Sequence, residues 1–73
     1  MGQKHILILG TGSVGKRHAI NLSSLGCTIS CMDPRSDRLE EVKQEIDVVG
    51  TYRSIEEAFS ESSENIDGVI VAS

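Results

Sequence analysis

The sequence predicts an α/β fold: an open parallel sheet with the strand order 3-2-1-4 that carries helices on both faces. Two observations lead to this prediction. Short apolar segments alternate along the chain with segments whose apolar residues recur at helical spacing. The connections between these segments are short, as in parallel sheets that are built from β-α-β units. The resulting order, β-α-β-α-β-α-β, fits one small domain of 73 residues.

The first strand and the first helix have the clearest pattern. Residues 5–9 (HILIL) form a continuous apolar run that stops at Gly10, which is typical of a parallel strand covered on both faces. Gly26 marks the end of the helix that follows, because glycine readily adopts the backbone conformation required there. One stripe of this helix is expected to face the sheet, namely Val14, His18, Leu22 and Leu25. His18 is therefore expected to be a packed side chain rather than a catalytic acid or base.

Three further strands are expected at residues 27–32, 47–50 and 66–72. Two cysteines, Cys27 and Cys31, lie in the first of these strands. Their side chains would face the same side about 13 Å apart, which is too far for a disulfide within one strand. No further metal ligands lie nearby in the sequence, so we interpret both cysteines as small buried hydrophobic residues.

Two more helices separate these strands. The first begins at Ser36, because the spacing of Leu39, Val42 and Ile46 places them on one helical face. The second begins after Ser54, where the sequence Ser-Ile-Glu-Glu is a capping box. Three apolar side chains of this last helix are expected to point into the core, namely Ile55, Ala58 and Phe59.

A glycine-rich segment joins the first strand to the first helix. Its sequence, Gly10-Thr11-Gly12-Ser13-Val14-Gly15, has the spacing Gly-x-Gly-x-x-Gly, and an acid, Asp33, stands 18 residues after its last glycine. The first glycine permits the tight turn, the second lets a pyrophosphate approach the backbone, and the third allows close packing of helix on strand. The N–H groups at the start of the helix would bind the phosphates, and the hydroxyls of Thr11 or Ser13 could contribute. This combination predicts a Rossmann-type dinucleotide-binding site.

Asp33 is expected to select the cofactor. From the end of the second strand its carboxylate can accept hydrogen bonds from the hydroxyls of the adenosine ribose, and its charge would repel the 2′-phosphate of NADP. Arg35 weakens this preference, because its side chain could cover the adenine or turn outward to accommodate a phosphate. NAD is therefore the expected cofactor, and NADP is the weaker candidate.

Three alternatives to this interpretation stay open. Residues 10–16 also match the start of a P-loop, but Arg17 stands where that motif needs a serine or threonine for Mg²⁺. The glycines could form only a turn, and Asp33-Pro34 could likewise be only a turn-forming pair. The domain could also bind another adenosine ligand, such as S-adenosylmethionine or FAD.

Composition limits the classes of partner. The formal net charge is −4 and the sequence pI is about 4.9, which argues against a nucleic-acid-binding or anionic-membrane surface. No apolar run is long enough for a membrane span, and the start of the chain lacks the apolar core of a secretory signal. We expect a cytoplasmic protein whose partner is a dinucleotide cofactor.

Four segments of the chain resemble the opening of the Gfo/Idh/MocA oxidoreductases, which include glucose–fructose oxidoreductase and inositol dehydrogenase. These segments are residues 6–18 (ILILGTGSVGKRH), Asp33-Pro34, residues 52–59 (YRSIEEAF) and residues 66–73 (IDGVIVAS). The resemblance implies an NAD-dependent oxidoreductase that transfers a hydride between a sugar-like hydroxyl and nicotinamide.

The resemblance also implies how cofactor-binding roles are divided along the chain. At the pyrophosphate it places Gly10, Gly12, Ser13, Val14 and Gly15. At the adenosine half it places Asp33 and Arg35, and towards the nicotinamide it places Ala72 and Ser73.

The resemblance covers only the first part of a member of that family. The family's catalytic lysine, in a Glu-Lys-Pro segment, and its substrate domain have no counterpart in this sequence. We therefore expect residues 1–73 to be the N-terminal part of a dinucleotide-binding Rossmann domain that binds cofactor and catalyses nothing by itself. A stand-alone or regulatory NAD-sensing module is the alternative. The last strand would form an apolar sheet edge, so self-association through residues 66–71 is also expected.

Overall fold

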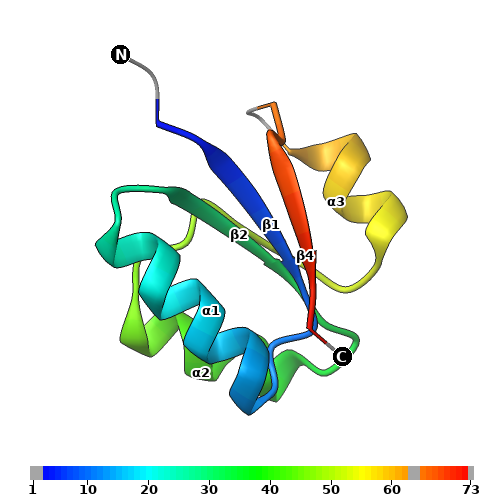
Figure 1. Cartoon of the computed structure of the whole chain (residues 1–73). Helices are drawn as coiled ribbons and strands as arrows, with labels where there is room; N and C mark the ends of the chain where they lie inside the picture. Colours follow the sequence, from blue (N-terminus) through cyan, green and yellow to red (C-terminus); the bar gives the residue numbers. More distant parts are fainter. Residues whose placement is uncertain (1–2, 63–64, 73) are drawn as a thin grey trace.

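Four parallel strands form one sheet between two helical layers, in a computed structural model that describes residues 3–62 and 65–72. The strands lie in the order β3-β2-β1-β4 and comprise β1 (His5–Leu9), β2 (Thr28–Met32), β3 (Gly50–Tyr52) and β4 (Gly68–Val71). The helices are α1 (Ser13–Ser24), α2 (Ser36–Glu45) and α3 (Ile55–Glu61). Helices α1 and α2 cover one face of the sheet and α3 lies on the other (Figure 1). The predicted fold class and strand order are confirmed.

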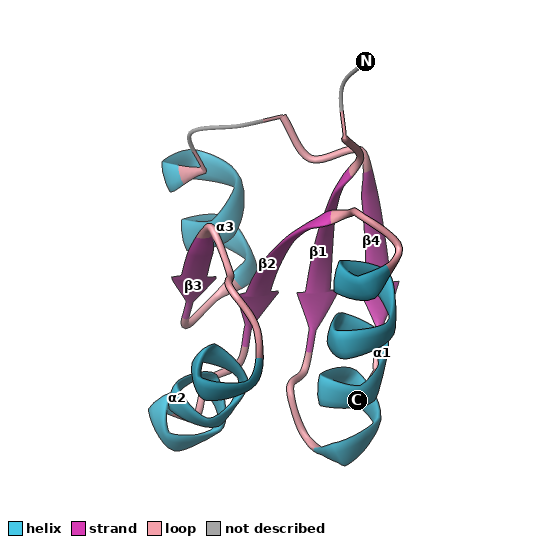
Figure 2. Cartoon of the chain, turned by 90° about the vertical axis from the view of Figure 1, so that its left-hand side faces the viewer, coloured by secondary structure: helices cyan, strands magenta, loops and turns pink. Residues whose placement is uncertain are grey.

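The central strand β1 pairs on both of its edges, so its apolar run is enclosed. It aligns with β2 from His5 opposite Thr28 to Leu9 opposite Met32, and Leu9 also lies opposite Val71 of β4. Because successive side chains of a strand point to opposite faces, its residues supply both cores. Ile8 packs under α1 and α2, whereas Leu7 packs on the side of α3. All four strands run in the same direction, so their carboxyl ends lie together at one end of the sheet (Figure 2).

The predicted buried stripe of α1 is wrong by one position. The side chains that face the sheet are Gly15 and Ala19, which are buried, and Leu22, which is partly buried against the core. His18 is exposed, and so are Val14 and Leu25, which are 56% and 78% exposed. The glycine loop sets this rotation, because Gly15 has to lie against the strand end for the helix to start there. His18 is thus a surface residue and not the packed side chain that we expected.

The third strand begins later than predicted. Residues 47–49 are not part of the sheet, and β3 pairs with β2 from Gly50 opposite Ser30 to Tyr52 opposite Met32. A Cβ atom on Gly50 would stand 2.3 Å from the Tyr52 hydroxyl oxygen, so a glycine is needed for the tyrosine ring to lie there. Val48 instead packs against the core from the connection before the strand.

Helix α3 begins as predicted, but fewer of its apolar side chains are buried than expected. The Ser54 hydroxyl accepts a hydrogen bond from the Glu57 N–H at 3.1 Å, which confirms the cap. Ala58 is buried between the helix and the sheet. Ile55 and Phe59 are 48% and 55% exposed, so the prediction that they point into the core is wrong. A single short helix does not cover the whole of its face of the sheet.

A buried histidine closes the amino-terminal end of the sheet, opposite the glycine loop. The His5 ring contacts the Ser30 hydroxyl through Nε2 and the Asn65 carbonyl oxygen through Nδ1, and its backbone N–H donates to Asp67. These contacts join β1, β2 and the segment before β4. Both cysteines are free; Cys31 is buried and Cys27 is partly buried against the same core. In the described part of the chain, no helix has the length and apolarity needed to cross a membrane.

Candidate functional site

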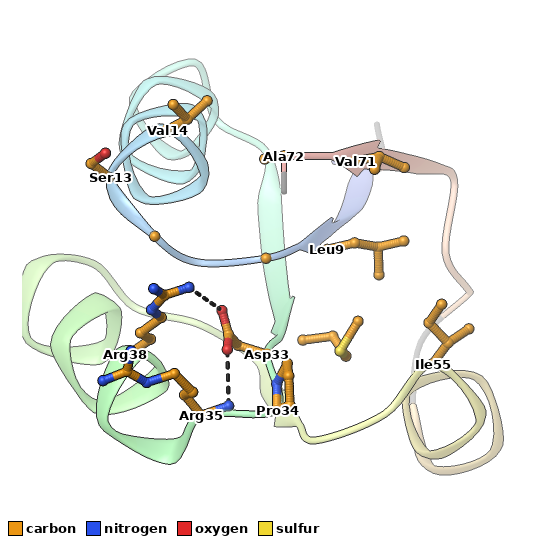
Figure 3. A pocket seen from close by; sticks show the side chains of 13 residues that line it. Leu9, Ser13, Val14, Asp33, Pro34, Arg35, Arg38, Ile55, Val71 and Ala72 are labelled. Atoms are coloured by element: carbon orange, nitrogen blue, oxygen red, sulfur yellow. Dashed lines mark hydrogen bonds and ion pairs between the residues drawn. The ribbon is translucent and has the colours of Figure 1, made fainter.

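A cavity of about 600 Å³ opens at the carboxyl ends of the strands, where parallel sheets commonly bind ligands. Its walls come from the ends of β1, β2 and β4, the glycine loop, the start of α2 and the start of α3 (Figure 3). The lining residues are Leu9, Gly10, Gly12, Ser13, Val14, Met32, Asp33, Pro34, Arg35, Arg38, Ile55, Val71 and Ala72.

Two glycines shape the loop that forms one wall of this cavity. Gly10 has a φ of 95°, a left-handed backbone conformation that residues other than glycine rarely adopt. A Cβ atom on Gly15 would stand 1.8 Å from the Gly10 carbonyl oxygen, so helix α1 can approach the strand end only because residue 15 has no side chain. The roles predicted for these two glycines, a tight turn and close packing, are confirmed.

Gly12 has a different environment from the other two. A Cβ atom there would make only an ordinary contact, 3.5 Å from an Arg38 guanidinium nitrogen. The backbone of this residue therefore borders open space in the cavity, and the protein's own packing does not explain the glycine. Gly12 is also the N-cap of α1, and no side chain among the described residues caps the helix. The N–H groups of its first turn remain able to bind an anion.

The Asp33 carboxylate links the end of β2 to the glycine loop. It is 2% exposed, and its Oδ2 accepts hydrogen bonds from the Thr11 N–H at 2.8 Å and the Thr11 hydroxyl at 3.2 Å. Its Oδ1 accepts the Arg35 N–H at 2.9 Å (Figure 3). Burial alone would raise the pKa of Asp33, but these hydrogen bonds and the nearby Arg38 charge together lower it. The side chain therefore carries a fixed negative charge at neutral pH.

Two arginines stand beside this carboxylate and differ in how they are held. The Arg35 guanidinium is exposed and forms a two-point ion pair with Asp37, with N···O distances of 2.8 and 3.2 Å. Arg38 points from α2 towards the glycine loop and lies 3.8 Å from Asp33 Oδ2 (Figure 3). That distance is within the range of an ion pair but is too long for a hydrogen bond, so Arg38 does not donate one to this oxygen.

The structure places the ten sequence-predicted site residues in three settings. Seven line the cavity: Gly10, Gly12, Ser13, Val14, Asp33, Arg35 and Ala72. Thr11 and Gly15 are buried just behind the wall, where Thr11 holds Asp33 and Gly15 packs on the strand. Ser73 lies outside the described residues.

Sequence reasoning missed six residues of the wall. Leu9, Met32 and Val71 are the last residues of their strands, so the strand register could have identified them. Ile55 is expected in the core from the sequence. Arg38 carries no motif signal, and only the position of α2 brings it to the loop. Pro34, the sixth, directly follows Asp33.

Comparison with known protein families identifies the domain type. A family model described as "Alanine dehydrogenase/PNT, C-terminal domain" matches residues 2–73, essentially the whole chain. Searches of curated proteins and of solved structures gave no match. The matched domain is a Rossmann-type NAD(P)-binding domain, which confirms the expected class of oxidoreductase domain. The match does not support the Gfo/Idh/MocA family or a sugar-like substrate.

Proposed function

The chain belongs to the alanine dehydrogenase/PNT C-terminal domain family, and from this premise we propose that it binds NAD as the cofactor-binding part of a dehydrogenase. The observation that carries the proposal is the convergence of three features on one cavity. The open backbone at Gly12, the start of α1 and the Asp33 carboxylate all border it, and no side chain of the described residues caps that helix. These features match the pyrophosphate and the ribose of a dinucleotide.

In the proposed complex the pyrophosphate lies over Gly12 and the first turn of α1, with Ser13 and Val14 beside it. The adenosine ribose lies against Asp33, whose Oδ1 accepts only the Arg35 N–H within the described residues and so retains a lone pair for a ribose hydroxyl. The nicotinamide extends towards Ala72, at the end of β4. When bound, NAD would accept or deliver the hydride, and these 73 residues would hold and orient it.

Two features favour NAD over NADP. The Asp33 carboxylate is negatively charged at neutral pH, because the hydrogen bonds and the Arg38 charge that lower its pKa outweigh its burial. A 2′-phosphate at the ribose would be repelled by this charge. The Arg35 guanidinium, which could have accommodated such a phosphate, is already paired with Asp37.

Titration calorimetry of the purified chain with NAD, NADP and S-adenosylmethionine tests the proposal. We expect NAD to bind most tightly, and a folded sample that binds neither dinucleotide would disprove it. In the variant Asp33→Asn the preference for NAD over NADP should fall, whereas Glu40→Gln removes one charge from the exposed side of α2 and should leave it unchanged. If the ratio of the NAD affinity to the NADP affinity is unaltered in Asp33→Asn, Asp33 does not contact the ribose.

We also propose that two copies of the chain associate through β4. Within the described residues β4 pairs with β1 alone, so its other edge has unpaired backbone N–H and C=O groups. Its outward-facing side chains on the α3 face, Val69 and Val71, are 44% and 71% exposed. An apolar strand edge of this kind, without charged residues, readily pairs with a second copy.

A further inference from the structure

We propose that Arg38 is a direct cofactor-binding residue that donates hydrogen bonds to a phosphate oxygen of the bound dinucleotide. The inference rests on the proposed function, because it concerns the same cavity. Neither the glycine motif nor the family match assigns Arg38 a role.

The position of the guanidinium supports this proposal. Arg38 reaches from α2 across the cavity to the glycine loop, where its Nη1 lies 3.5 Å from the place that a Cβ atom on Gly12 would occupy. The group thus borders the space that Gly12 leaves open, where a pyrophosphate can approach the backbone. It also borders Asp33, at a distance of 3.8 Å from Oδ2. The guanidinium therefore stands between the proposed positions of the pyrophosphate and the ribose.

The few interactions that the Arg38 side chain makes also support the proposal. Its side chain is 42% exposed, and within residues 3–62 and 65–72 its one ion pair is the long contact with Asp33. The carboxylate, in contrast, already accepts three hydrogen bonds from Thr11 and Arg35 and does not need Arg38 as a donor. Arginine N–H groups that face a cavity match the oxygens of a phosphate, which they can bind at two points.

A dinucleotide has two kinds of phosphate that could reach Arg38: the pyrophosphate, which NAD and NADP share, and the 2′-phosphate, which only NADP carries. Both present the same anionic oxygens to the guanidinium. The two cofactors therefore distinguish the sources, because a pyrophosphate contact affects both ligands equally and a 2′-phosphate contact affects NADP alone.

Calorimetry of Arg38→Met, which keeps the length of the side chain but removes its charge, tests the assignment. We expect the affinity to fall about 10- to 100-fold, as for the loss of a hydrogen bond to a charged group. An equal loss for NAD and NADP indicates the pyrophosphate, and a loss confined to NADP indicates the 2′-phosphate. Lys43→Met removes a cation from the same helix outside the cavity. This variant should bind NAD and NADP with the same affinities as the original chain.

Two further measurements separate direct binding from a structural role. Arg38→Lys, which keeps the charge but not the planar fork, should recover part of the affinity. The affinity of the original chain should fall more steeply with added salt than that of Arg38→Met, because one phosphate–cation contact is screened. If Arg38→Met binds both cofactors as tightly as the original chain, the assignment is wrong while the proposed function stands. If the original chain binds neither, both fail.

Discussion

The Thr11 N–H donates a hydrogen bond to Asp33 Oδ2 at 2.8 Å and thereby joins the glycine loop to the carboxyl end of the neighbouring strand. The two residues are both buried, although each belongs to a motif that would be assigned to cofactor binding from the sequence. The acid at the end of β2 therefore has two roles. It lines the cavity, and through Oδ2 it fixes the glycine loop that forms another part of the wall.

The structural role of Asp33 predicts a specific loss of stability in acid. Because burial is outweighed by hydrogen bonds and the Arg38 charge, its pKa is lower in the folded chain than in the unfolded one. Its contribution to stability is complete above the unfolded pKa of about 3.9 and is lost as the pH falls through the lower folded value. Urea unfolding of the original chain and of Asp33→Asn between pH 7 and pH 3 measures this. The difference in the free energy of unfolding between the two proteins should shrink towards pH 3. A difference that stays constant over this range would contradict the structural role of Asp33.

A second prediction concerns Gly15. Its replacement by alanine would place a Cβ atom 1.8 Å from the Gly10 carbonyl oxygen, which forces α1 away from the strand. Because the clash is with backbone rather than with a flexible side chain, we expect Gly15→Ala to lower the free energy of unfolding by about 3 kcal/mol. Denaturant unfolding checks this value. A variant as stable as the original chain would mean that the helix is not held as close to the strand as described.

Replacing Gly12 with alanine is expected to weaken NAD binding more than it lowers stability, in contrast to the replacement of Gly15. Alanine at this position makes only ordinary contacts with Arg38, so we expect the free energy of unfolding to fall by no more than about 1 kcal/mol, the usual cost of an alanine at a helix N-cap. The methyl group would nevertheless occupy the space through which the pyrophosphate approaches the backbone. NAD binding should therefore weaken about tenfold or more. Calorimetry beside a denaturation curve tests both halves, and tight NAD binding by Gly12→Ala would exclude the proposed position of the pyrophosphate.

These glycines also show how far sequence reasoning extends. The order of strands and the roles of Gly10 and Gly15 follow from the motif, because each role depends on backbone geometry that few other residues permit. The rotation of α1 does not follow, because close approach to the strand requires small residues, whereas a search for an apolar stripe favours large ones. Ala19 therefore lies in the core, and Val14 faces the cavity.

The remaining errors have a similar physical basis. Val48 and Val49 have strand-forming side chains, but the strand register with β2 begins at Gly50, and before it the Val49 N–H bonds to β2, at the Ile29 carbonyl oxygen. Arg38 escapes sequence analysis because its relation to Gly12 is fixed by the packing of α2 and not by spacing along the chain. A site residue of this kind becomes visible only when the tertiary arrangement is known.

Cys31 gives a prediction about thiol chemistry. Burial raises the pKa of its thiol to about 12, so the reactive thiolate is scarce in the folded chain at pH 8. In a Cys27→Ala background, we expect Cys31 to react with iodoacetamide only in urea. Its protonated state contributes stability that is complete below the unfolded pKa of about 8.5 and is lost as the pH rises towards 12. Equal labelling rates in the presence and absence of urea would show that the thiol is accessible.

The free edge of β4 predicts the state of assembly. Val69 lies on this edge and outside the cavity, so a charge there interferes with pairing between two copies but not directly with cofactor binding. We expect sedimentation velocity to show dimers of the original chain and monomers of Val69→Lys, because lysine on an edge strand blocks the addition of another strand. Leu25→Lys is the matched control, since Leu25 is more exposed but is the residue after α1 and belongs to no strand. If the original chain sediments as a monomer at high concentration, or if both variants dissociate equally, β4 is not the contact.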